Sequence, residues 1–478
     1  MDRFTRTADI IKAYYSYKQT ADSATFVKKV CSFFDFIKDE SLSDADLNLL
    51  LFLANEAGIP QYYDLLKSKF TNAEIGDESI NSLTMSALFH DASLIRGDSK
   101  LHRYQKHVLD SFVATQRNRY VLTAPTSFGK TFLVYEIIQK MQYQNVLLIF
   151  PAISLLSENY ARLCSWEAFS DYAIHSLSEE EFDITQKNIF IFTPERFLSF
   201  MDSHQHLHFN FAFIDEVYKI DNSFVIDQET SGENERDTAY RLALEFICNL
   251  TDNMLLAGPY MALPTAETEL HKSFNDFARD NGFVFLRYNQ FEIVSKEYTT
   301  VKSRQQYIID NIPVEIGSAS KTQKIANIIL ALSSPTENTI IYCNRKSDTE
   351  SYARQLLNNQ ELISIFQERC SAVDAPVYEI FLEHLQNTFG DDWIVLKALK
   401  GRIGIHHSLV PKYIQKEIIN LFNCGALICL FSTTTITEGV NTSAKNIIIT
   451  SGKKGAKKLR QFDAKNIAGR AGRFQQHY

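Results

Sequence analysis

The sequence lacks any long hydrophobic run. None of its apolar stretches approaches the roughly 18 consecutive apolar residues that a membrane-spanning helix needs. The first residues, MDRFTRTADIIKAYY, also lack the basic and then apolar layout of a secretory signal. We therefore expect a soluble, cytoplasmic protein with no membrane partner.

The sequence also lacks the cysteine and histidine spacings of common metal modules. Its seven cysteines form no CxxC pair, and no histidine pair has zinc-finger spacing. Cys424 and Cys429 flank apolar residues on a predicted strand, a pattern that favours buried thiols over metal ligands.

Positive charge is not in excess. The net charge is −8, which excludes a protein coated in basic surface. It leaves room for a nucleic-acid channel, because phosphate binding needs only local positive charge.

The length of 478 residues is enough for roughly three domains. Residues 1–98 have apolar positions at helical spacing, and Ser43 and Asp44 predict a helix start before LNLLLF. We expect an all-helical accessory or partner-docking domain there.

From residue 99 onward, short apolar runs alternate with helical stretches. Runs of this length are typical of central strands in a parallel sheet covered on both faces. The alternation lapses around 280–320 and then resumes. The pattern predicts an α/β architecture with two parallel sheets, divided into a first domain over 99–285, a linker over 286–320 and a second domain over 321–478. The runs are YVLTA, NVLLIF, NIFIF, FAFID and NMLLAG, followed by NTIIYC, ALICLFS and NIIIT.

A phosphate-binding loop is predicted between the strand YVLT and the helix TFLVYEIIQK. The segment has the GKT ending of a P-loop, although Ala124 replaces its usual first glycine. Backbone N–H groups at the helix start would surround the β-phosphate of ATP, and Gly129 would permit the close approach. Lys130 would neutralise the β- and γ-phosphates, and Thr131 would ligate Mg²⁺. The alternative is a glycine turn that caps a helix. The nucleotide-binding set predicted in this loop is Thr126, Ser127, Phe128, Gly129, Lys130 and Thr131.

Two carboxylates follow the apolar run FAFI. Asp215 would hold Mg²⁺ through its water shell, and Glu216 would orient and deprotonate the attacking water. The alternative is that two adjacent acids merely begin a loop.

The order of motifs around these two elements resembles the superfamily-two helicases, most closely their Ski-type DExH branch. The resemblance covers roughly residues 99–478 and rests on segments at both ends of that range: LHRYQ (101–105), FPAISLLSENY (150–160), TPER (193–196), DEVY (215–218), IIYCNRKSD (340–348), the stretch 404–449 with its paired histidines and GVN, and NIAGRAGR (466–473).

The resemblance implies two tandem RecA-like P-loop domains with ATP bound between them. Gln105 would contact adenine, and Gly439 and Asn441 would approach the nucleotide from the second domain. Arg470 and Arg473 would offset negative charge in the transition state, although a basic helix start in solvent is the alternative.

The resemblance also implies a nucleic-acid path across both domains. Contacts of this kind hold the sugar–phosphate backbone and do not read sequence. Between motifs V and VI, the glycines of SGKKGAKKLR suggest a basic hairpin; a solvated turn is the alternative. His406 and His407 form a pair that the family keeps without a metal. The predicted nucleic-acid contacts are Pro151, Thr193, Pro194, Arg196, Asn344, Thr433, Lys453 and Lys454.

Three positions depart from the family pattern. Tyr218 replaces the histidine of the DExH box, Asn466 replaces the glutamine of motif VI, and the segment 257–260 (AGPY) replaces motif III. The hydrolytic residues are all present, whereas the elements that couple hydrolysis to strand movement are altered. An ATP-dependent helicase or translocase is the main interpretation, and an ATP-switched sensor or clamp that does not unwind is the alternative. A degenerate scaffold is disfavoured because the hydrolytic set is intact.

The predicted partner is single-stranded or partly duplex nucleic acid, with DNA favoured over RNA. The DEVY box and the helical front domain are similar to bacterial anti-phage helicases of the Hachiman type, which implies a nuclease or other effector as a second partner. Ski-type helicases continue into winged-helix and ratchet domains, whereas this sequence ends five residues after Arg473. Of a compact variant and a part of a longer protein, we favour the second.

Overall fold

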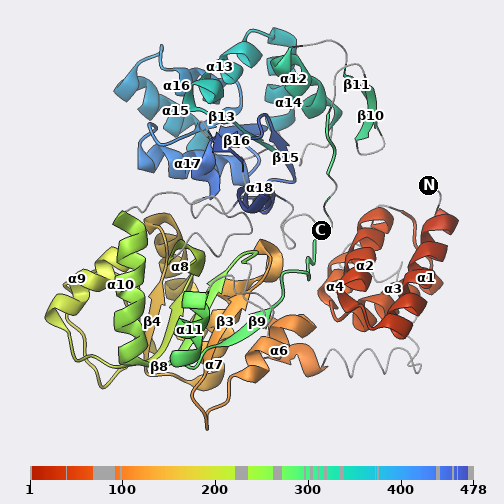
Figure 1. Ribbon diagram of the computed structural model, residues 1–478. Helices are drawn as coiled ribbons and strands as arrows, with labels where there is room; N and C mark the ends of the chain where they lie inside the picture. The colour runs from red at the N-terminus through yellow and green to blue at the C-terminus, as the bar shows by residue number, and fades with distance from the viewer. Residues whose placement is uncertain are drawn as a thin grey trace. The chain divides into compact units, whose positions relative to one another are not determined.

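The computed structural model describes most of the chain, and its elements are drawn in Figure 1. The described residues are 3–38, 40–67, 92–96, 99–220, 235–261, 272–294, 296, 298–301, 305–309, 312–316, 320–332, 338–371, 373, 376–437, 442–454, 457–459 and 461–471. The chain divides into two compact units, Met1–Ser295 and Lys296–His477, which are described separately below. Among the described residues, no helix is long and apolar enough to span a membrane.

The first unit begins with a helical domain. Its third helix starts where the sequence predicts, because the Ser43 hydroxyl and the Asp46 carboxylate form a reciprocal capping box around Asp44. Phe26 and Leu50 are fully or almost fully buried between these helices, and Tyr17 stacks on Phe26. The helices of this domain are α1 (Arg3–Thr20), α2 (Ser23–Ile37), α3 (Asp44–Ala57) and α4 (Gln61–Lys67). A two-stranded antiparallel ribbon, β1 (Ile95–Arg96) with β2 (Ser99–Lys100), leads out of it.

The rest of the first unit is a seven-stranded parallel sheet of order β5-β6-β4-β7-β8-β3-β9. The five runs predicted as strands in this region all lie in it. The strands are β3 (Arg119–Thr123), β4 (Asn145–Ile149), β5 (Tyr172–His175), β6 (Lys187–Phe192), β7 (Phe209–Ile214), β8 (Thr251–Gly258) and β9 (Val284–Arg287).

Helices cover both faces of this sheet (Figure 1), which explains why its central strands are apolar throughout. On one face, side chains of alternate strand positions pack against α9, α10 and α11. On the other, Phe211 contacts Phe112, which follows α6, and Tyr143, which follows α7. The helical segments of this part are α6 (Arg103–Ser111), η1 (Thr126–Phe128), α7 (Lys130–Met141), α8 (Ile153–Ser165), η2 (Glu167–Phe169), α9 (Pro194–Ser203), η3 (Val217–Ile220), α10 (Glu235–Leu250) and α11 (Lys272–Asp280).

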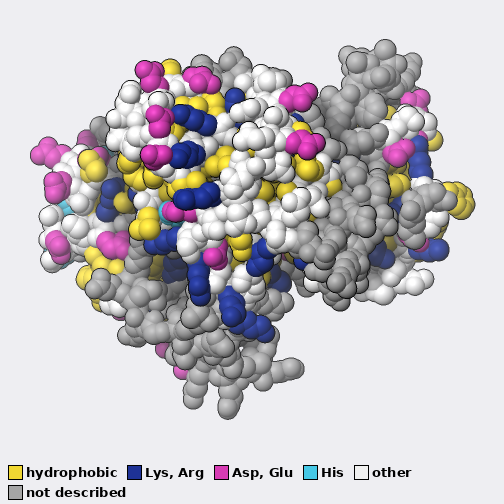
Figure 2. Space-filling model, turned by 90° about the horizontal axis from the view of Figure 1, so that it is seen from above, with side chains coloured by type: hydrophobic (Ala, Val, Ile, Leu, Met, Phe, Trp, Pro, Cys, Tyr) yellow, Lys and Arg dark blue, Asp and Glu magenta, His cyan; other side chains and the backbone are white. Residues whose placement is uncertain are grey.

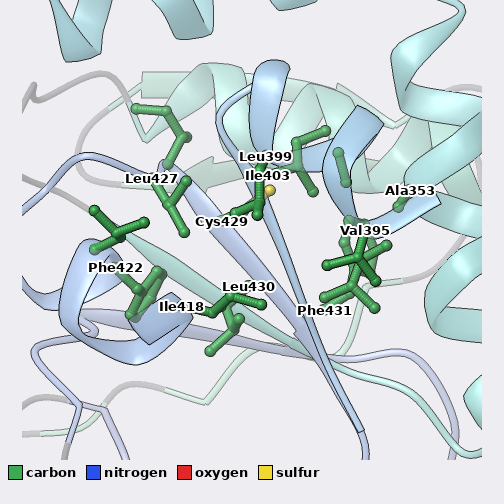
Figure 3. Close-up of a cluster of buried hydrophobic side chains, with 14 of the residues drawn as sticks. Ala353, Val395, Leu399, Ile403, Ile418, Phe422, Leu427, Cys429, Leu430 and Phe431 are labelled. Carbon is green, nitrogen blue, oxygen red and sulfur yellow. The ribbon is translucent and has the colours of Figure 1, made fainter. Parts of the chain in front are cut away.

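The second unit has a four-stranded parallel sheet of order β13-β14-β12-β15. Its core is shown in Figure 3, where Leu430 and Phe431 of β14 lie among side chains of the surrounding helices, including Ala353, Val395 and Ile418. The strands are β12 (Thr339–Tyr342), β13 (Ile403–His406), β14 (Cys429–Ser432) and β15 (Asn446–Ile449). The helical segments are α12 (Lys321–Ala331), α13 (Lys346–Leu357), α14 (Gln360–Cys370), α15 (Pro376–Phe389), α16 (Ile394–Lys400), α17 (Lys412–Asn423), η5 (Thr434–Thr437) and α18 (Gln461–Ala468).

Two antiparallel hairpins also belong to the second unit. One, β10 (Gln305–Ile309) with β11 (Ile312–Ile316), lies in the stretch predicted as a linker. The other, β16 (Lys453–Lys454) with β17 (Lys457–Lys458), confirms the predicted basic hairpin. The two parallel sheets and the helical front confirm the predicted tandem RecA-like architecture. One cysteine expectation is only half right: Cys429 is buried in β14, but Cys424 is exposed, because it follows the last residue of α17.

Candidate nucleotide and nucleic-acid site

The P-loop connects β3 to α7 through the short turn η1. Gly129 ends this turn in the left-handed conformation, with φ of 75°. A Cβ at Gly129 would lie 2.7 Å from Nε2 of Gln105. The left-handed backbone angle therefore favours glycine at the position where α7 begins, and a larger residue would also displace the end of the Gln105 side chain.

The polar atoms of this loop show whether it could bind a triphosphate. Nζ of Lys130 donates to the carbonyls of Ala124 (3.1 Å) and Pro125 (2.9 Å), so the ammonium lies over the loop. Oγ of Ser127 is buried, and among the described residues it has no hydrogen-bond partner. A buried hydroxyl without a partner costs free energy that a bound oxyanion would recover. The donor set at the start of α7 thus suits phosphate oxygens.

The two predicted carboxylates follow β7, which lies between β4 and β8 in the sheet. The backbone of Asp215 continues the sheet, because its N–H donates to the Ile149 carbonyl at 3.0 Å. Glu216 has a positive φ of 50°, which is unusual for a side chain of its size, and is only 7% exposed. Its Oε2 lies 2.9 Å from Nζ of Lys219, so an ion pair holds the carboxylate that we predict to activate water.

Burial raises the pKa of Asp215 to about 6, and the neighbouring Glu216 charge adds to the increase. The nearby Lys130 charge opposes it. The P-loop lysine and the Asp215 carboxylate are therefore close enough to interact electrostatically, as a shared metal–nucleotide site requires. A bound Mg²⁺ would favour the ionised carboxylate further.

The predicted adenine contact, Gln105, is engaged with the protein itself. Its Nε2 donates to the carbonyl of Phe128 at 2.9 Å, and its Oε1 accepts from the backbone N–H of His102 at 3.1 Å. Gln105 therefore stabilises the P-loop through the Phe128 carbonyl. Its contact with adenine stays a prediction.

The segment 257–260, which replaces motif III, lies at the end of β8. It is hydrogen-bonded to the residue that follows β3, the strand before the P-loop. The carbonyl of Gly258 accepts from Ala124 N–H at 3.3 Å. Tyr260 has φ of 50°, is buried, and donates to Glu292 at 2.8 Å. Although the usual residues are absent, this position is still joined directly to the start of the P-loop.

The predicted nucleic-acid contacts of the first unit follow β4 and β6, which are neighbours in the sheet. Pro151 follows β4, and Thr193 follows β6 and caps α9, with Pro194 at its first position. Nη1 of Arg196 donates to the Ser176 carbonyl at 3.0 Å. These residues lie at the carboxyl edge of the sheet, as do the P-loop and Asp215, and in open parallel sheets this edge is the usual ligand-binding edge.

In the second unit, Asn344 and Thr433 follow the adjacent strands β12 and β14. His406 ends β13, and burial lowers its pKa to about 4. Oε1 of the partly exposed Glu350 lies 3.2 Å from Nε2 of His407. Among the described residues no cluster of His, Cys, Asp or Glu side chains could hold a metal ion.

The described motif VI residues, 466–471, lie on and just after α18. Arg470 is 8% exposed, and its carbonyl accepts from the Thr442 hydroxyl. Oδ1 of Asn466 is buried and has no hydrogen-bond partner within the described part of the chain. Asn466 therefore keeps a free polar atom at the position where the family has glutamine.

Some predicted positions fall outside the described residues: Gly439, Asn441 and Arg473. Lys453 is exposed on β16, and the side chain of Lys454 also lies outside the description.

Comparison with known proteins gives one matching family model and several similar proteins. Residues 98–249 match the family model for the type III restriction enzyme res subunit. The chain is 25% identical over 417 residues to "Anti-bacteriophage protein B" of Escherichia coli (strain K12), which covers 87% of this chain and 50% of that protein. It is 22% identical over 401 residues to "Helicase POLQ-like" of Drosophila melanogaster, with 79% and 36% covered.

A further relative carries the same signal: "Probable ATP-dependent DNA helicase HFM1" of Mus musculus is 23% identical over 405 residues, with 78% of this chain and 26% of that protein covered. These similarities extend over both units, where the motifs lie in the expected order. Over both units, the chain is therefore similar to helicases of superfamily two. It spans half the length or less of these relatives.

Two residues at the candidate site could not be predicted from the sequence. His102 contacts the P-loop carbonyl of Phe128, and Lys219 pairs with Glu216. The spacing of His102 and Gln105 is that of a helix cap and its third residue, but histidine is an uncommon cap. The pairing of Lys219 depends on the turn η3, which no pattern in the sequence predicts.

Proposed function

We propose that the chain is the motor part of an ATP-dependent nucleic-acid helicase or translocase. The observation that carries this proposal is the juxtaposition of Lys130 and Asp215 at the carboxyl edge of one sheet, with a phosphate-suited loop between β3 and α7. Relatives named as helicases over both units support the same activity.

In the proposed reaction, water attacks the γ-phosphorus of ATP and the bond to the β-phosphate oxygen breaks, releasing ADP and phosphate. Lys130 and the N–H groups at the start of α7 bind the phosphates, and Glu216 orients the water and accepts its proton. Thr131 and Asp215 would hold Mg²⁺, which would offset charge on the phosphate oxygens. Arg470 and Arg473 would complete the site when the two units close, and nucleic-acid binding would favour that closure.

The polynucleotide would bind along the residues that follow β4 and β6 in one unit and β12 and β14 in the other. Positive and negative side chains are interspersed on the face shown in Figure 2, so binding would depend on local positive charge. Thr193, Arg196 and Thr433 would contact the sugar–phosphate backbone of DNA, or of RNA. The name of the Escherichia coli relative suggests a role in defence against bacteriophage. The resemblance to Hachiman-type helicases implies a nuclease or other effector as a partner in that role.

The P-loop assignment is tested by Lys130→Ala. Without the ammonium, the loop loses its charge contact with the phosphates, so we expect ATP binding to weaken and turnover to fall at least about a hundredfold. The measurement is nucleotide binding by fluorescence titration together with phosphate release. Parent-level turnover in this variant would rule out the assignment.

A second function, an ATP-switched sensor or clamp, is favoured by the altered coupling positions. Tyr218, Asn466 and the segment 257–260 all differ from the family pattern. A strand-displacement assay beside an ATPase assay separates the two functions. Turnover stimulated by DNA without any displacement supports the sensor.

A further inference from the structure

The middle of the P-loop is held by residues that precede it in the chain. The carbonyl of Phe128 accepts two hydrogen bonds, from Nε2 of Gln105 (2.9 Å) and from Nε2 of His102 (3.2 Å). Nδ1 of His102 must then be the unprotonated nitrogen, because it accepts the backbone N–H of Gln105 at 3.1 Å. Burial lowers the pKa of His102 to about 4, so this neutral form persists at physiological pH.

Arg103, which lies between His102 and Gln105 in the sequence, forms hydrogen bonds with the helical domain. The backbone N–H of Arg103 donates to the Gly58 carbonyl at 2.9 Å. Its guanidinium donates to the carbonyls of Asn55 (2.9 Å) and Glu56 (3.2 Å). These carbonyls lie at the C-terminal end of α3, which carries the negative end of the helix dipole. The Asn55 carbonyl also accepts the N–H of Gly58 at 3.0 Å, and the guanidinium adds a second donor. Arg103 therefore caps α3 from the neighbouring domain.

Two further contacts flank this cap on the helical domain. Nε2 of Gln61 donates to the Lys100 carbonyl at 3.0 Å, and the Lys100 ammonium lies 2.6 Å from Asp64. Gln61 and Asp64 are both on α4. The segment that enters α6 is thus fixed to the helical domain on both sides of His102.

The helical domain also grips a second segment beside the P-loop. The Tyr62 hydroxyl and the Cys31 thiol both donate to the carbonyl of Ile293, the latter at 3.5 Å. Phe291, two residues earlier, has its ring centroid 4.0 Å from that of Tyr104.

The same aromatic cluster reaches the P-loop itself. The ring of Phe128, which is fully buried, lies against His102 (4.8 Å between centroids) and Tyr288 (5.4 Å). Backbone hydrogen bonds and ring packing therefore connect the helical domain to the same P-loop residue by two routes.

We propose that the helical domain sets the conformation of the P-loop, and that Arg103 is the positioning residue through which it acts. The inference rests on the proposed function, in which this loop binds ATP. When Arg103 holds the end of α3, His102 and Gln105 are placed to fix the Phe128 carbonyl, and the loop N–H groups are preorganised for phosphate. Release of that cap lets the loop relax. The helical domain thereby controls nucleotide affinity without touching the nucleotide.

Two variants break the cap in different ways. Arg103→Ala removes the guanidinium. Gly58→Ala places a methyl group 2.7 Å from Cβ and 2.8 Å from Nε of Arg103, so Arg103 must move. Gly58 has φ of 71°, which also strains any alanine, and Gly282 provides the matched control: it has the same φ of 71° and no atom within 4 Å of an added Cβ.

The experiment measures amide hydrogen exchange of the segment 124–133 in the free protein, and KM and kcat for ATP. We expect both cap variants to exchange faster in this segment and to raise KM about tenfold, the effect of losing roughly 1.4 kcal/mol from one or two hydrogen bonds. The kcat should change less than about twofold, because the groups that contact the reacting atoms are untouched. Gly282→Ala should match the parent in both readouts.

The outcomes separate this inference from the proposed function. Unchanged exchange and KM in both cap variants would overturn the inference, as would a general loss of melting temperature with faster exchange throughout the chain. If the parent protein binds no ATP, the proposed function fails. In that case, faster exchange confined to 124–133 in the cap variants would still support the inference that Arg103 fixes the conformation of the loop.

Discussion

At the residue scale, Glu216 combines a strained backbone with a buried ion pair. Its φ of 50° costs on the order of 1 kcal/mol for a side chain of this kind, and Lys219 holds the carboxylate at 2.9 Å. Strain of this kind persists where surrounding contacts over-determine the conformation. The nearby carbonyl of Asp215, which accepts from the Tyr240 hydroxyl at 3.4 Å, is one such contact.

The role of Glu216 is tested by Glu216→Gln. The amide keeps the size of the side chain but cannot accept the proton of water, so we expect ATP to bind at near-parent affinity while turnover falls at least about a hundredfold. Binding and single-turnover hydrolysis give the two values. Glu167→Gln, at an exposed site on η2, is the control. A parent rate in Glu216→Gln would show that another group activates the water.

The raised pKa of Asp215 makes a prediction about pH and stability. Its folded pKa of about 6 lies above the ordinary value of 3.8, so the free protein loses stability as pH rises from about 4 through about 6. Asp215→Asn removes that cost, so at pH 7.5 it should increase the free energy of unfolding by roughly 3 kcal/mol and raise the melting temperature. The same variant should lose Mg²⁺-dependent turnover.

The same raised pKa predicts how the turnover of the parent protein depends on pH. Mg²⁺ needs the ionised carboxylate, so turnover should decline as pH falls below about 6. Asp392→Asn changes an exposed carboxylate whose pKa is lowered by its hydrogen bond with Lys397, and it should not raise the melting temperature. A melting temperature for Asp215→Asn at or below that of the parent would contradict the assignment of a costly buried charge.

At the element scale, the basic hairpin β16–β17 gives the prediction for nucleic-acid binding. Lys453 and Lys458 are cross-strand partners, and both are exposed. If they contact phosphates, the double variant to alanine should weaken binding and reduce the slope of log K against log salt by about 1.4 to 1.8, because each contact contributes about 0.7 to 0.9. A fluorescence anisotropy titration over a salt series measures it.

The matched control removes the same charge from the helical domain. Lys28 and Lys29 are exposed on α2, and their double variant to alanine should leave the slope unchanged. Equal slopes for the hairpin variant and the parent would return β16–β17 to the alternative of a solvated turn.

The strands of both sheets differ in how far the sequence could predict them. β3, β4, β6, β7 and β8 are central and buried on both faces, so their uninterrupted apolar runs are plain in the sequence. β5 and β9 lie at the edges and have only four residues each, YAIH and VFLR. Apolar side chains on them can be exposed, as Val284 is at 56%, so apolar character does not report burial there. Edge strands need the neighbouring strand to define them, and no local pattern marks them.

The residues of the candidate site also differ in how far the sequence could predict them. The residues of the P-loop and the DEVY box lie in short local motifs whose strand context is visible in the sequence. The partners that fix them come from elsewhere: His102 is 26 residues from Phe128, and Gly58 is 45 residues from Arg103. Contacts at such separations depend on the packing of the helical domain, which periodicity alone does not determine.

At the scale of the whole molecule, the chain places its proposed chemistry on two separate compact units. Each unit has its own parallel sheet and buried core, and each places its motifs after the carboxyl ends of its strands. The first contributes the phosphate loop and the carboxylates, and the second contributes Arg470. Neither unit alone has the full set of residues that the proposed hydrolysis needs, so the proposed activity would require the two units to close around ATP.

The central claim is that nucleic acid stimulates ATP turnover by bringing the second unit to the first. The direct measurement is the rate of phosphate release with and without single-stranded DNA, duplex DNA and RNA, for the parent chain and for Arg470→Ala. We predict that at least one polynucleotide raises the parent rate several-fold, and that Arg470→Ala lowers the stimulated rate at least about a hundredfold while ATP still binds. A rate that is indifferent to every polynucleotide and to the loss of Arg470 would contradict the account.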